Sequence, residues 1–475
     1  MFLYSALFRI VGPVLIVAVS LIALRLLAYW WSFAFHWKRY RRRDAVATAD
    51  LRGLDVPYVR IQVTTRGSAG STEVILRGIR QVMRLAEEDV EFYGRILSVE
   101  VITESEVQAH LLRRTFAEAP VAVHGLVVPA TYATAYDTQL KARGLHYAVE
   151  HRRAGWNRRP GRCFVVHYDE ESVMVPAELR KLLAALASTD KKLLEGPIYY
   201  PLEYTDASPL CRAMEANRPV GCFECRHVME KGMPLHLHGS NLVIEEQFEN
   251  TVGWDIGNLD GRPLIAEDYV FGMNAFLLGG REVFGWHGCV MLEQPPFSVR
   301  SAFKQRHRWI FGVLQGMAIA RRSPSFVELP VRVRLGLVWG TRFRIATFAL
   351  GAVVGALTLA FLPLLIARSI GALVFGGASP APSWLTGWMA AVGALWLGSV
   401  FIGAWYNVAD AGLSQWGRWD EICRAVSSAP IAGVIESAAG LLAVVEWLSG
   451  HRDVAWLPTP KTRAADAAAV RRQAS

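Results

Sequence analysis

The residues best suited to chemistry lie in two short segments in the second half of the chain. Ile-Ala-Glu-Asp-Tyr occupies 265–269, and Gln-Arg-His-Arg-Trp occupies 305–309. The first segment offers Asp268 as a carboxylate base beside a second acid, Glu267. The second segment places a glutamine, two arginines and a tryptophan within about one and a half helical turns. A base and a cationic, aromatic group of this kind suit the transfer of a group from a phosphorylated donor.

A further acidic segment, Asp169-Glu170-Glu171, follows the apolar run Cys163–His167, which predicts a short buried strand. Asp169 and Glu171 stand two positions apart in the chain. Two carboxylates at this spacing can hold Mg²⁺ or Mn²⁺ against a diphosphate. An acidic turn that caps a helix over 176–187 is the structural alternative.

The surrounding pattern predicts the parallel sheet of an α/β fold. Residues 58–65 alternate as a strand does, a glycine-containing turn leads into a helix at about 73–87, and a second strand covers 96–102. Ligands of such sheets lie beyond the carboxyl ends of the strands. The acids that follow the strand at 163–167 therefore belong at the ligand-binding edge.

Glu267-Asp268 followed by Gln305-x-x-Arg308-Trp309 resembles the signature of membrane-embedded family-2 glycosyltransferases. The resemblance implies a GT-A-type, Rossmann-like α/β domain, a nucleoside diphosphate sugar as donor, and Mg²⁺ or Mn²⁺. This chain departs from the family pattern at two positions. Ala266 replaces the threonine of Thr-Glu-Asp, and Glu171 replaces the last aspartate of Asp-x-Asp.

The resemblance also assigns roles to individual residues. Asp268 would act as the general base of an inverting transfer, Arg308 would contact the diphosphate, and Trp309 would shape the acceptor site. The complete expected site comprises the base Asp268, the metal ligands Asp169 and Glu171, the donor-binding residues Glu104, Lys141, Gln305 and Arg308, and the acceptor-binding residues Trp309, Glu267, Gly239, Ser240 and Asn241.

Four segments between 196 and 258 carry a narrower resemblance, to egghead-type β-mannosyltransferases: Gly196–Tyr200, Cys222–Met229, His236–Asn241 and Val252–Asp255. It implies GDP-mannose as the donor, with a UDP-hexose as competitor, and a lipid-linked or membrane-proximal saccharide as acceptor. Cys222 and Cys225, with the histidines of the third segment, could also bind zinc. Because no second pair follows nearby at regular spacing, we interpret them as part of a redox-silent loop.

Composition favours a protein with both soluble and membrane regions: 52% of residues are hydrophobic, 16 are tryptophan and the mean hydropathy is +0.23. The net charge of +9 comes from arginines beside apolar runs. That placement predicts contact with anionic lipid rather than nucleic acid. Six cysteines in 475 residues do not form a disulfide framework.

We therefore expect an N-terminal transmembrane helix at 1–37, a basic linker at 38–56, the GT-A domain at 57–300, interfacial amphipathic helices with the Gln-x-x-Arg-Trp motif at 301–344, a C-terminal transmembrane region at 345–450 with segments at about 345–367, 384–408 and 425–449, and a tail at 451–475. The basic run at 38–43 places the catalytic domain in the cytosol, at a bacterial plasma membrane given the composition. Glu436 and Glu446 are costly in lipid, so we expect 425–449 to lie in the interface or to re-enter.

The predicted function is an inverting hexosyltransferase. A processive polysaccharide synthase that uses a UDP- or GDP-sugar would share every motif described above. A metal-dependent phosphohydrolase could use the same carboxylates and arginines. From a different class, a non-catalytic membrane scaffold or transporter would carry a large cytosolic domain without needing the base Asp268.

Overall fold

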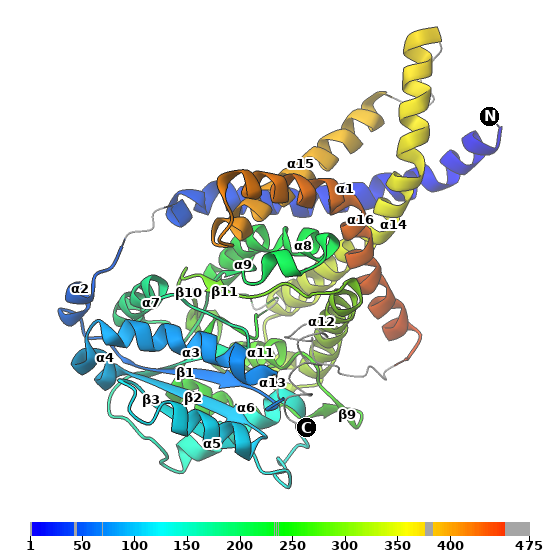
Figure 1. Cartoon of the computed structure of the whole chain (residues 1–475). Helices are drawn as coiled ribbons and strands as arrows, with labels where there is room; N and C mark the ends of the chain where they lie inside the picture. The colour runs from blue at the N-terminus through cyan, green and yellow to red at the C-terminus, as the bar shows by residue number, and fades with distance from the viewer. Residues whose placement is uncertain are drawn as a thin grey trace, which may run out of the picture.

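A computed structural model describes residues 2–41, 45–68, 70–231, 233, 235, 237–375 and 383–451 (Figure 1). Its centre is a seven-stranded sheet in the order β10-β5-β7-β4-β1-β2-β3. Only β7 runs antiparallel to its neighbours, β4 and β5. The α/β fold class is thereby confirmed. The strands are β1 (Tyr58–Thr64), β2 (Leu97–Thr103), β3 (Ala122–Val127), β4 (Cys163–Tyr168), β5 (Leu193–Glu195), β7 (Leu242–Glu245) and β10 (Phe284–Trp286).

Helices cover both faces of this sheet, and each face has its own apolar core. One core is formed with α3 (Ser71–Glu87), α4 (Val90–Ile96) and α7 (Pro176–Ser188), and the other with α6 (Leu140–Arg153), α10 (Glu246–Val252) and α11 (Glu267–Gly279). The remaining elements up to residue 328 are α2 (Thr48–Arg52), α5 (Glu106–Thr115), η1 (Tyr204–Asp206), α8 (Pro209–Glu215), α9 (Arg218–Glu230), η2 (Arg281–Val283), α12 (Val299–Ala320), α13 (Pro324–Glu328), and two small sheets that pair β6 (Ile198–Tyr199) with β11 (Met291–Leu292) and β8 (Asn258–Leu259) with β9 (Arg262–Pro263).

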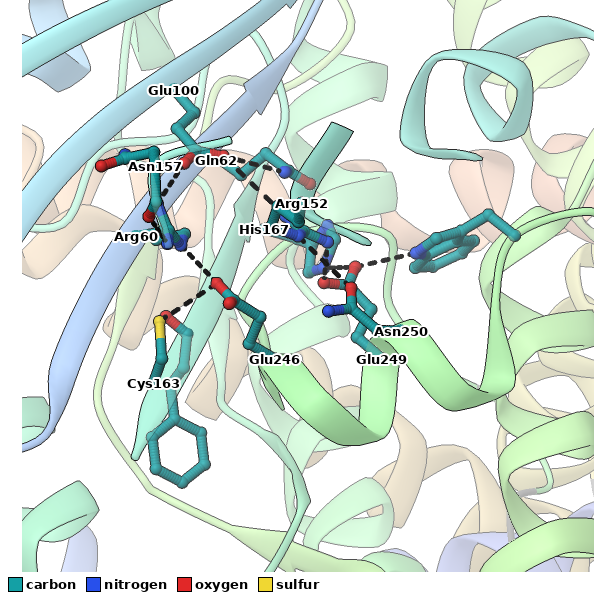
Figure 2. Close-up of polar contacts among 12 residues, drawn as sticks. Arg60, Gln62, Glu100, Arg152, Asn157, Cys163, His167, Glu246, Glu249 and Asn250 are labelled. Carbon is teal, nitrogen blue, oxygen red and sulfur yellow. Dashed lines mark hydrogen bonds and ion pairs between the residues drawn. The ribbon is translucent and has the colours of Figure 1, made fainter. Parts of the chain in front are cut away.

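The alternation along β1 sorts its side chains onto these two faces. Val59, Ile61 and Val63 join the core beneath α3 and α4, while Arg60 and Gln62 point to the opposite face. That polar face is not solvated, because α10 and the segment after α6 cover it. Arg60 donates to Glu100 at 2.7 Å and to Glu246, and all three lie in the network that Figure 2 shows.

A second part of the same network surrounds the buried carboxylate of Glu249. It pairs with Arg152, with His167 at 2.9 Å, and with the indole N–H of Trp254 at 2.8 Å. Burial by itself would raise the pKa of Glu249, but Arg152 and His167 oppose it and lower that pKa to about 2. The carboxylate is therefore fully charged at neutral pH and compensates the buried arginine.

Glu249→Gln should lower the free energy of unfolding by about 3–5 kcal/mol, because it removes the closest carboxylate from the buried Arg152, while Glu100 lies 3.8 Å from that arginine. The pKa of Glu249 is lowered by folding, so its contribution is present at neutral pH and is lost as the pH falls from about 4 toward 2. Chemical unfolding in detergent at pH 7 measures the difference. Glu150→Gln, at an exposed pair with Arg153, is the control and should change stability by less than about 1 kcal/mol. Equal stability of Glu249→Gln and the parent would contradict the prediction.

Four helices in the described part of the chain are long and apolar enough to cross a membrane. They are α1 (Phe2–Arg41), α14 (Val331–Phe375), α15 (Ser383–Ala409) and α16 (Gln415–Leu448). The expected boundary at 344/345 falls inside α14, which is one continuous helix. Arg42, Arg43 and the tail from 452 onward lie outside the described residues.

Helix α16 differs from the other three in its contacts. Its acids pair with residues of α8 and α12: Glu421 with Arg212 at 2.5 Å, Glu436 with Arg306 at 2.7 Å, and Glu446 with His307 at 2.6 Å. Figure 1 shows α16 running beside α8 and on toward α12, α1 lying across the domain over α9, and the outer parts of α14 and α15 extending away from the sheet. Three of the four acids of α16 therefore pair with the catalytic domain, and the fourth, Asp420, is exposed. Its place in the membrane interface remains a prediction.

Candidate active site

Residues from four separate segments meet at the ammonium group of Lys141, in the first turn of α6. Lys141 Nζ lies 2.6 Å from Asp169 Oδ1, 3.8 Å from Glu267 Oε1 and 3.0 Å from the backbone oxygen of Gly239. Asp169 directly follows β4, at the edge of the sheet expected for ligands. The structure therefore brings together four residues that the sequence predicted separately.

Asp268 completes this cluster from the first turn of α11. Its Oδ1 accepts the backbone N–H of Tyr269 at 2.8 Å. Gly239 passes so close that a Cβ there would lie 3.4 Å from Asp268 Oδ2 and 3.3 Å from Lys141 Nζ. Glycine thus allows the backbone to approach both charged groups, and a larger residue would displace one of them.

The environment of Asp268 tunes its protonation for proton transfer near neutral pH. Burial and the adjacent charge of Glu267 raise the pKa of Asp268 to about 7, against the opposing effects of the Tyr269 N–H and Lys141. A general base is most effective when its pKa lies near the working pH. Asp268 therefore has the position and the acidity of a base.

Arg308 reaches the cluster because α12 packs very closely on α11. A Cβ on Gly312 would lie 2.5 Å from the Cβ of Ala266, and one on Gly316 would lie 2.5 Å from the ring of Tyr269. The small side chain of Ala266, where the family pattern has threonine, suits this close contact. Burial lowers the pKa of Arg308, while the carboxylates of the cluster oppose that effect.

The charges of the cluster leave room for a divalent cation. Asp169, Glu171, Glu267 and Asp268 all act electrostatically on Arg308, and Lys141 lies among three of them, Asp169, Glu267 and Asp268. Within the described residues no three His, Cys, Asp or Glu side chains form a ready-made metal cage. Mg²⁺ commonly binds through one or two carboxylates together with substrate phosphates. Asp169 and Glu171 fit such a site, whereas Glu170 accepts a hydrogen bond from Thr65.

Trp309 is held by two arginines on the side of α12 that faces α8 and α16. Its ring lies 4.2 Å from the guanidinium of Arg218 and 4.3 Å from that of Arg306. Arg306 is buried and donates to Glu215, to Glu436 at 2.7 Å and to Gln305 at 2.9 Å. Gln305, predicted to bind the donor, is thus also engaged with Arg306. Arg306 had no assigned role among the predicted site residues. The acid at position 436, in an apolar segment, could have indicated that a buried basic partner exists.

Glu436→Gln should raise the KM for the acceptor with little change in the KM for the donor. The substitution weakens the ion pair that fixes Arg306 beneath Trp309, and Asp169 and Lys141 lie outside this contact. Because the partner arginine stays buried, we expect an effect of about 2–5 kcal/mol on acceptor binding. Steady-state kinetics with each substrate varied separately measures the split, with the exposed pair variant Asp420→Asn of α16 as control. An increase confined to the donor KM would refute this role.

The other predicted residues lie at the margins of the cluster or inside the protein. Glu104 directly follows β2 and pairs with Arg143 at 2.6 Å. Ser240 and Asn241 are buried, and Asn241 donates to the backbone oxygens of Pro197 at 2.8 Å and Cys289 at 2.9 Å. Their side chains therefore support the loop, and of the three predicted residues here Gly239 is the one beside Lys141 and Asp268.

The interpretation of Cys222 and Cys225 as part of a loop is wrong, because both lie within helix α9. Both thiols are buried against the domain. A helix forms here because Pro219 occupies its first turn and apolar positions recur along the buried face. His236 lies outside the described residues.

Glu195 is a further acid near the site that sequence reasoning missed. It ends β5, is buried, and accepts the backbone N–H of His238 at 2.6 Å. Burial, and then the charge of Asp268, raise its pKa to about 8. The available signal was an acid at the end of a short apolar strand. Glu195 fixes the segment that leads into Gly239.

Acidic and basic side chains gather at the carboxyl edge of a mixed α/β sheet, and the chain also has apolar helices long enough to cross a membrane. Together these features fit a membrane-associated GT-A-type transferase. The chain belongs to glycosyl transferase family group 2, whose model matches residues 164–401. The predicted family and enzyme class are thereby confirmed, and the non-catalytic scaffold or transporter is excluded.

Mannosyltransferases are among the relatives. The protein named Beta-1,4-mannosyltransferase egh, from Drosophila melanogaster, is 25% identical over 260 residues, which are 54% of this chain and 52% of that protein. Beta-1,4-mannosyltransferase bre-3 from Caenorhabditis elegans is 26% identical over 194 residues, 40% of this chain and 41% of that protein. The matched region thus spans about half the length, or less, of these relatives.

One similar solved structure is the mannosyltransferase PcManGT from Pyrobaculum calidifontis in complex with GDP-Man and Mn²⁺. It has 17% sequence identity and a TM-score of 0.43, over 82% of this chain and 99% of that chain. Staphylococcus aureus TarS, residues 1–349, has 9% identity and a TM-score of 0.33, over 83% of this chain and 92% of that chain.

Proposed function

We propose that the protein is an inverting hexosyltransferase that moves mannose from GDP-mannose to a lipid-linked or membrane-proximal saccharide. The observation that carries this proposal is the position of Asp268. Its carboxylate, with a pKa of about 7, stands beside Lys141, Asp169 and Arg308 at the carboxyl edge of the sheet. The names of the relatives favour mannose as the transferred sugar.

In the proposed reaction, Asp268 accepts the proton of an acceptor hydroxyl. The hydroxyl oxygen forms a bond to the anomeric carbon from the face opposite the diphosphate. The bond between that carbon and the phosphate oxygen breaks, and the nucleoside diphosphate leaves with the electron pair. Attack from the opposite face inverts the anomeric centre.

The cations of the cluster would bind the departing diphosphate. Arg308 offers a planar fork of donors, and Lys141 offers a compact charge between Asp169 and Glu267. Asp169 and Glu171 would hold Mg²⁺ or Mn²⁺, which neutralises charge on the diphosphate when bound. Glu104 and Gln305 lie further out as the remaining donor contacts.

The acceptor would approach from the side of α12, where Trp309 and Glu267 border the cluster and Gly239 lies beneath it. Helix α12 is bound to α16, which contacts α14 and α15. This arrangement favours an acceptor presented by the membrane. The basic run 38–43 at the end of α1 supports a catalytic domain on the cytosolic side of a bacterial plasma membrane.

The test is release of nucleoside diphosphate by the detergent-purified protein with Mn²⁺. GDP-mannose, UDP-glucose and UDP-N-acetylglucosamine are each offered with and without polar lipid extract. Release of GDP from GDP-mannose that lipid stimulates, with one sugar added per acceptor, is the expected result. UDP release with a long polymer would move the assignment to a processive synthase. Phosphate release without an acceptor would indicate a phosphohydrolase.

Cys423 offers a measurement of sidedness, because it is exposed and the other five cysteines, all described, are buried. If α16 lies on the cytosolic face, a membrane-impermeant maleimide should label inverted vesicles and leave intact cells unlabelled. Cys423→Ser supplies the background signal. Labelling of intact cells would place this part of α16 on the other side and overturn the proposed orientation.

A further inference from the structure

Two loops carry the residues assigned to the two substrates. The donor-side loop, 169–172, follows β4 and holds Asp169 and Glu171; the acceptor-side loop, 237–241, precedes β7 and holds Gly239. Lys141 connects the two loops at the active-site surface, through Asp169 Oδ1 and the Gly239 oxygen. A second connection lies below it, inside the protein.

This second connection is the carboxylate of Glu293. Its Oε1 accepts the hydroxyl of Ser172 at 3.1 Å and also accepts the hydroxyl of Ser240. Ser172 Oγ in turn accepts the backbone N–H of Asp169 at 3.0 Å. All three side chains are buried, with exposed fractions of 6% for Glu293, 1% for Ser172 and 3% for Ser240. One carboxylate oxygen therefore holds both loops.

The backbone of Glu293 is held by backbone hydrogen bonds outside these two loops, including those of the preceding residue to Val173, which follows the donor-side loop. It directly follows β11, its N–H donates to the Tyr199 oxygen at 2.8 Å, and its oxygen accepts the N–H of Leu202 at 3.1 Å. The preceding residue, Leu292, exchanges two backbone hydrogen bonds with Val173, at 2.8 and 2.9 Å. Glu293 thus extends from a well-anchored strand end toward both loops.

We propose that Glu293 is a positioning residue that sets the distance between the donor-side and acceptor-side loops. It acts through Ser172 on Asp169 and through Ser240 on Gly239, and its burial keeps it from touching either substrate. Without the carboxylate, both hydroxyls lose a buried acceptor and each loop can relax separately. The assignment of the loops to donor and acceptor rests on the proposed function; the connection itself does not.

The first test measures the mobility of the two loops, by hydrogen–deuterium exchange of the full-length protein in detergent. Glu293→Leu removes the acceptor oxygen at similar volume, and Glu293→Gln keeps an amide oxygen there. Gln294→Leu is the matched control, since Gln294 is equally buried but accepts from Arg77 of α3. Glu293→Leu should speed hydrogen–deuterium exchange in both loops. Glu293→Gln should speed it much less, and Gln294→Leu should leave exchange in both loops unchanged.

The second test is kinetic. Glu293→Leu should lower kcat/KM by about 10- to 100-fold for donor and acceptor alike, a range typical of residues that orient metal ligands. Ser172→Ala should weaken Mn²⁺-dependent GDP binding in the parent but change it less than about twofold in the Glu293→Leu background, because the shared contact is already lost. Rescue by Glu293→Gln would separate positioning from a general loss of folding.

Unchanged exchange in either loop of folded Glu293→Leu would overturn the proposal. So would additive effects of Ser172→Ala and Glu293→Leu on GDP binding. If the parent turns over no sugar nucleotide, the proposed function fails, and the exchange experiment still decides whether Glu293 couples the loops. The two failures are therefore distinguishable.

Discussion

Asp268→Asn should abolish sugar transfer while leaving the donor site largely intact. The amide cannot accept the acceptor proton, so we expect kcat to fall by about 10²- to 10⁴-fold. Asparagine preserves the shape and the contact with the Tyr269 N–H, so Mn²⁺-dependent GDP binding should change little. Steady-state turnover and calorimetric GDP titration measure the two effects. Asp260→Asn, at an exposed pair with Arg322, is the control.

The pH dependence of the same residue gives an independent check. Activity of the parent should rise with pH through about 7, because only the ionised carboxylate can accept a proton. Folding raises the pKa of Asp268 from 3.8 to about 7, so the stability of the parent falls as the pH rises from about 4 to about 7 and stays reduced above pH 7. Asp268→Asn should therefore unfold at a higher temperature than the parent at pH 8 and at the same temperature near pH 4. A variant less stable than the parent at pH 8 would contradict the assigned environment.

Lys141→Met should disable the donor side of the site. The ammonium group joins Asp169, Glu267 and the Gly239 oxygen, and its loss removes the closest positive charge from Asp169 and Glu267. Removing one member of a buried charge pair costs about 2–5 kcal/mol, which corresponds to roughly 30- to several-thousand-fold. We expect both the affinity for GDP and kcat/KM for the donor to fall by this factor.

Two further variants sharpen this result. Lys141→Arg should recover little, since the guanidinium is too large for a position only 3.0 Å from a backbone oxygen. Lys191→Met, far from the cluster in a half-exposed pair with Glu282, should bind GDP like the parent. Normal nucleotide affinity in Lys141→Met would mean that Lys141 serves the fold alone.

The sequence was sufficient to predict the sheet near the site and the acids at its edge. Hydrophobic alternation defined β1 and β2, and an apolar run defined β4 with Asp169 at its end, because these strands follow local rules. The motifs also identified Asp268 and Arg308 as neighbours. What joins them in space, the close packing of Gly312 on Ala266, depends on glycines whose role is visible only when two helices meet.

Contacts between distant segments could not be predicted in this way. Arg306 and Glu436 are 130 positions apart, and no local pattern pairs them. The polar residues of β1 alternate with apolar ones, a pattern typical of a strand with one solvent-exposed face. The fold shows instead that Arg60 is buried under α10. Likewise, Glu293 lies outside every motif, since its function depends on two serines that reach it from other loops.

The pairing of α16 with α8 and α12 has a consequence for how the protein is made. The counter-charges of Arg212, Arg306 and His307 are Glu421, Glu436 and Glu446, which follow α14 and α15 in the chain. During synthesis from the N-terminus, the catalytic domain emerges first and its Trp309 side is completed only after those helices have been inserted. A fragment that stops before α14 would keep the sheet and Asp268 but would lack Glu421, the partner of Arg212, and would leave Arg306 with Glu215 and without Glu436. Biosynthesis thus completes the surroundings of Trp309 last.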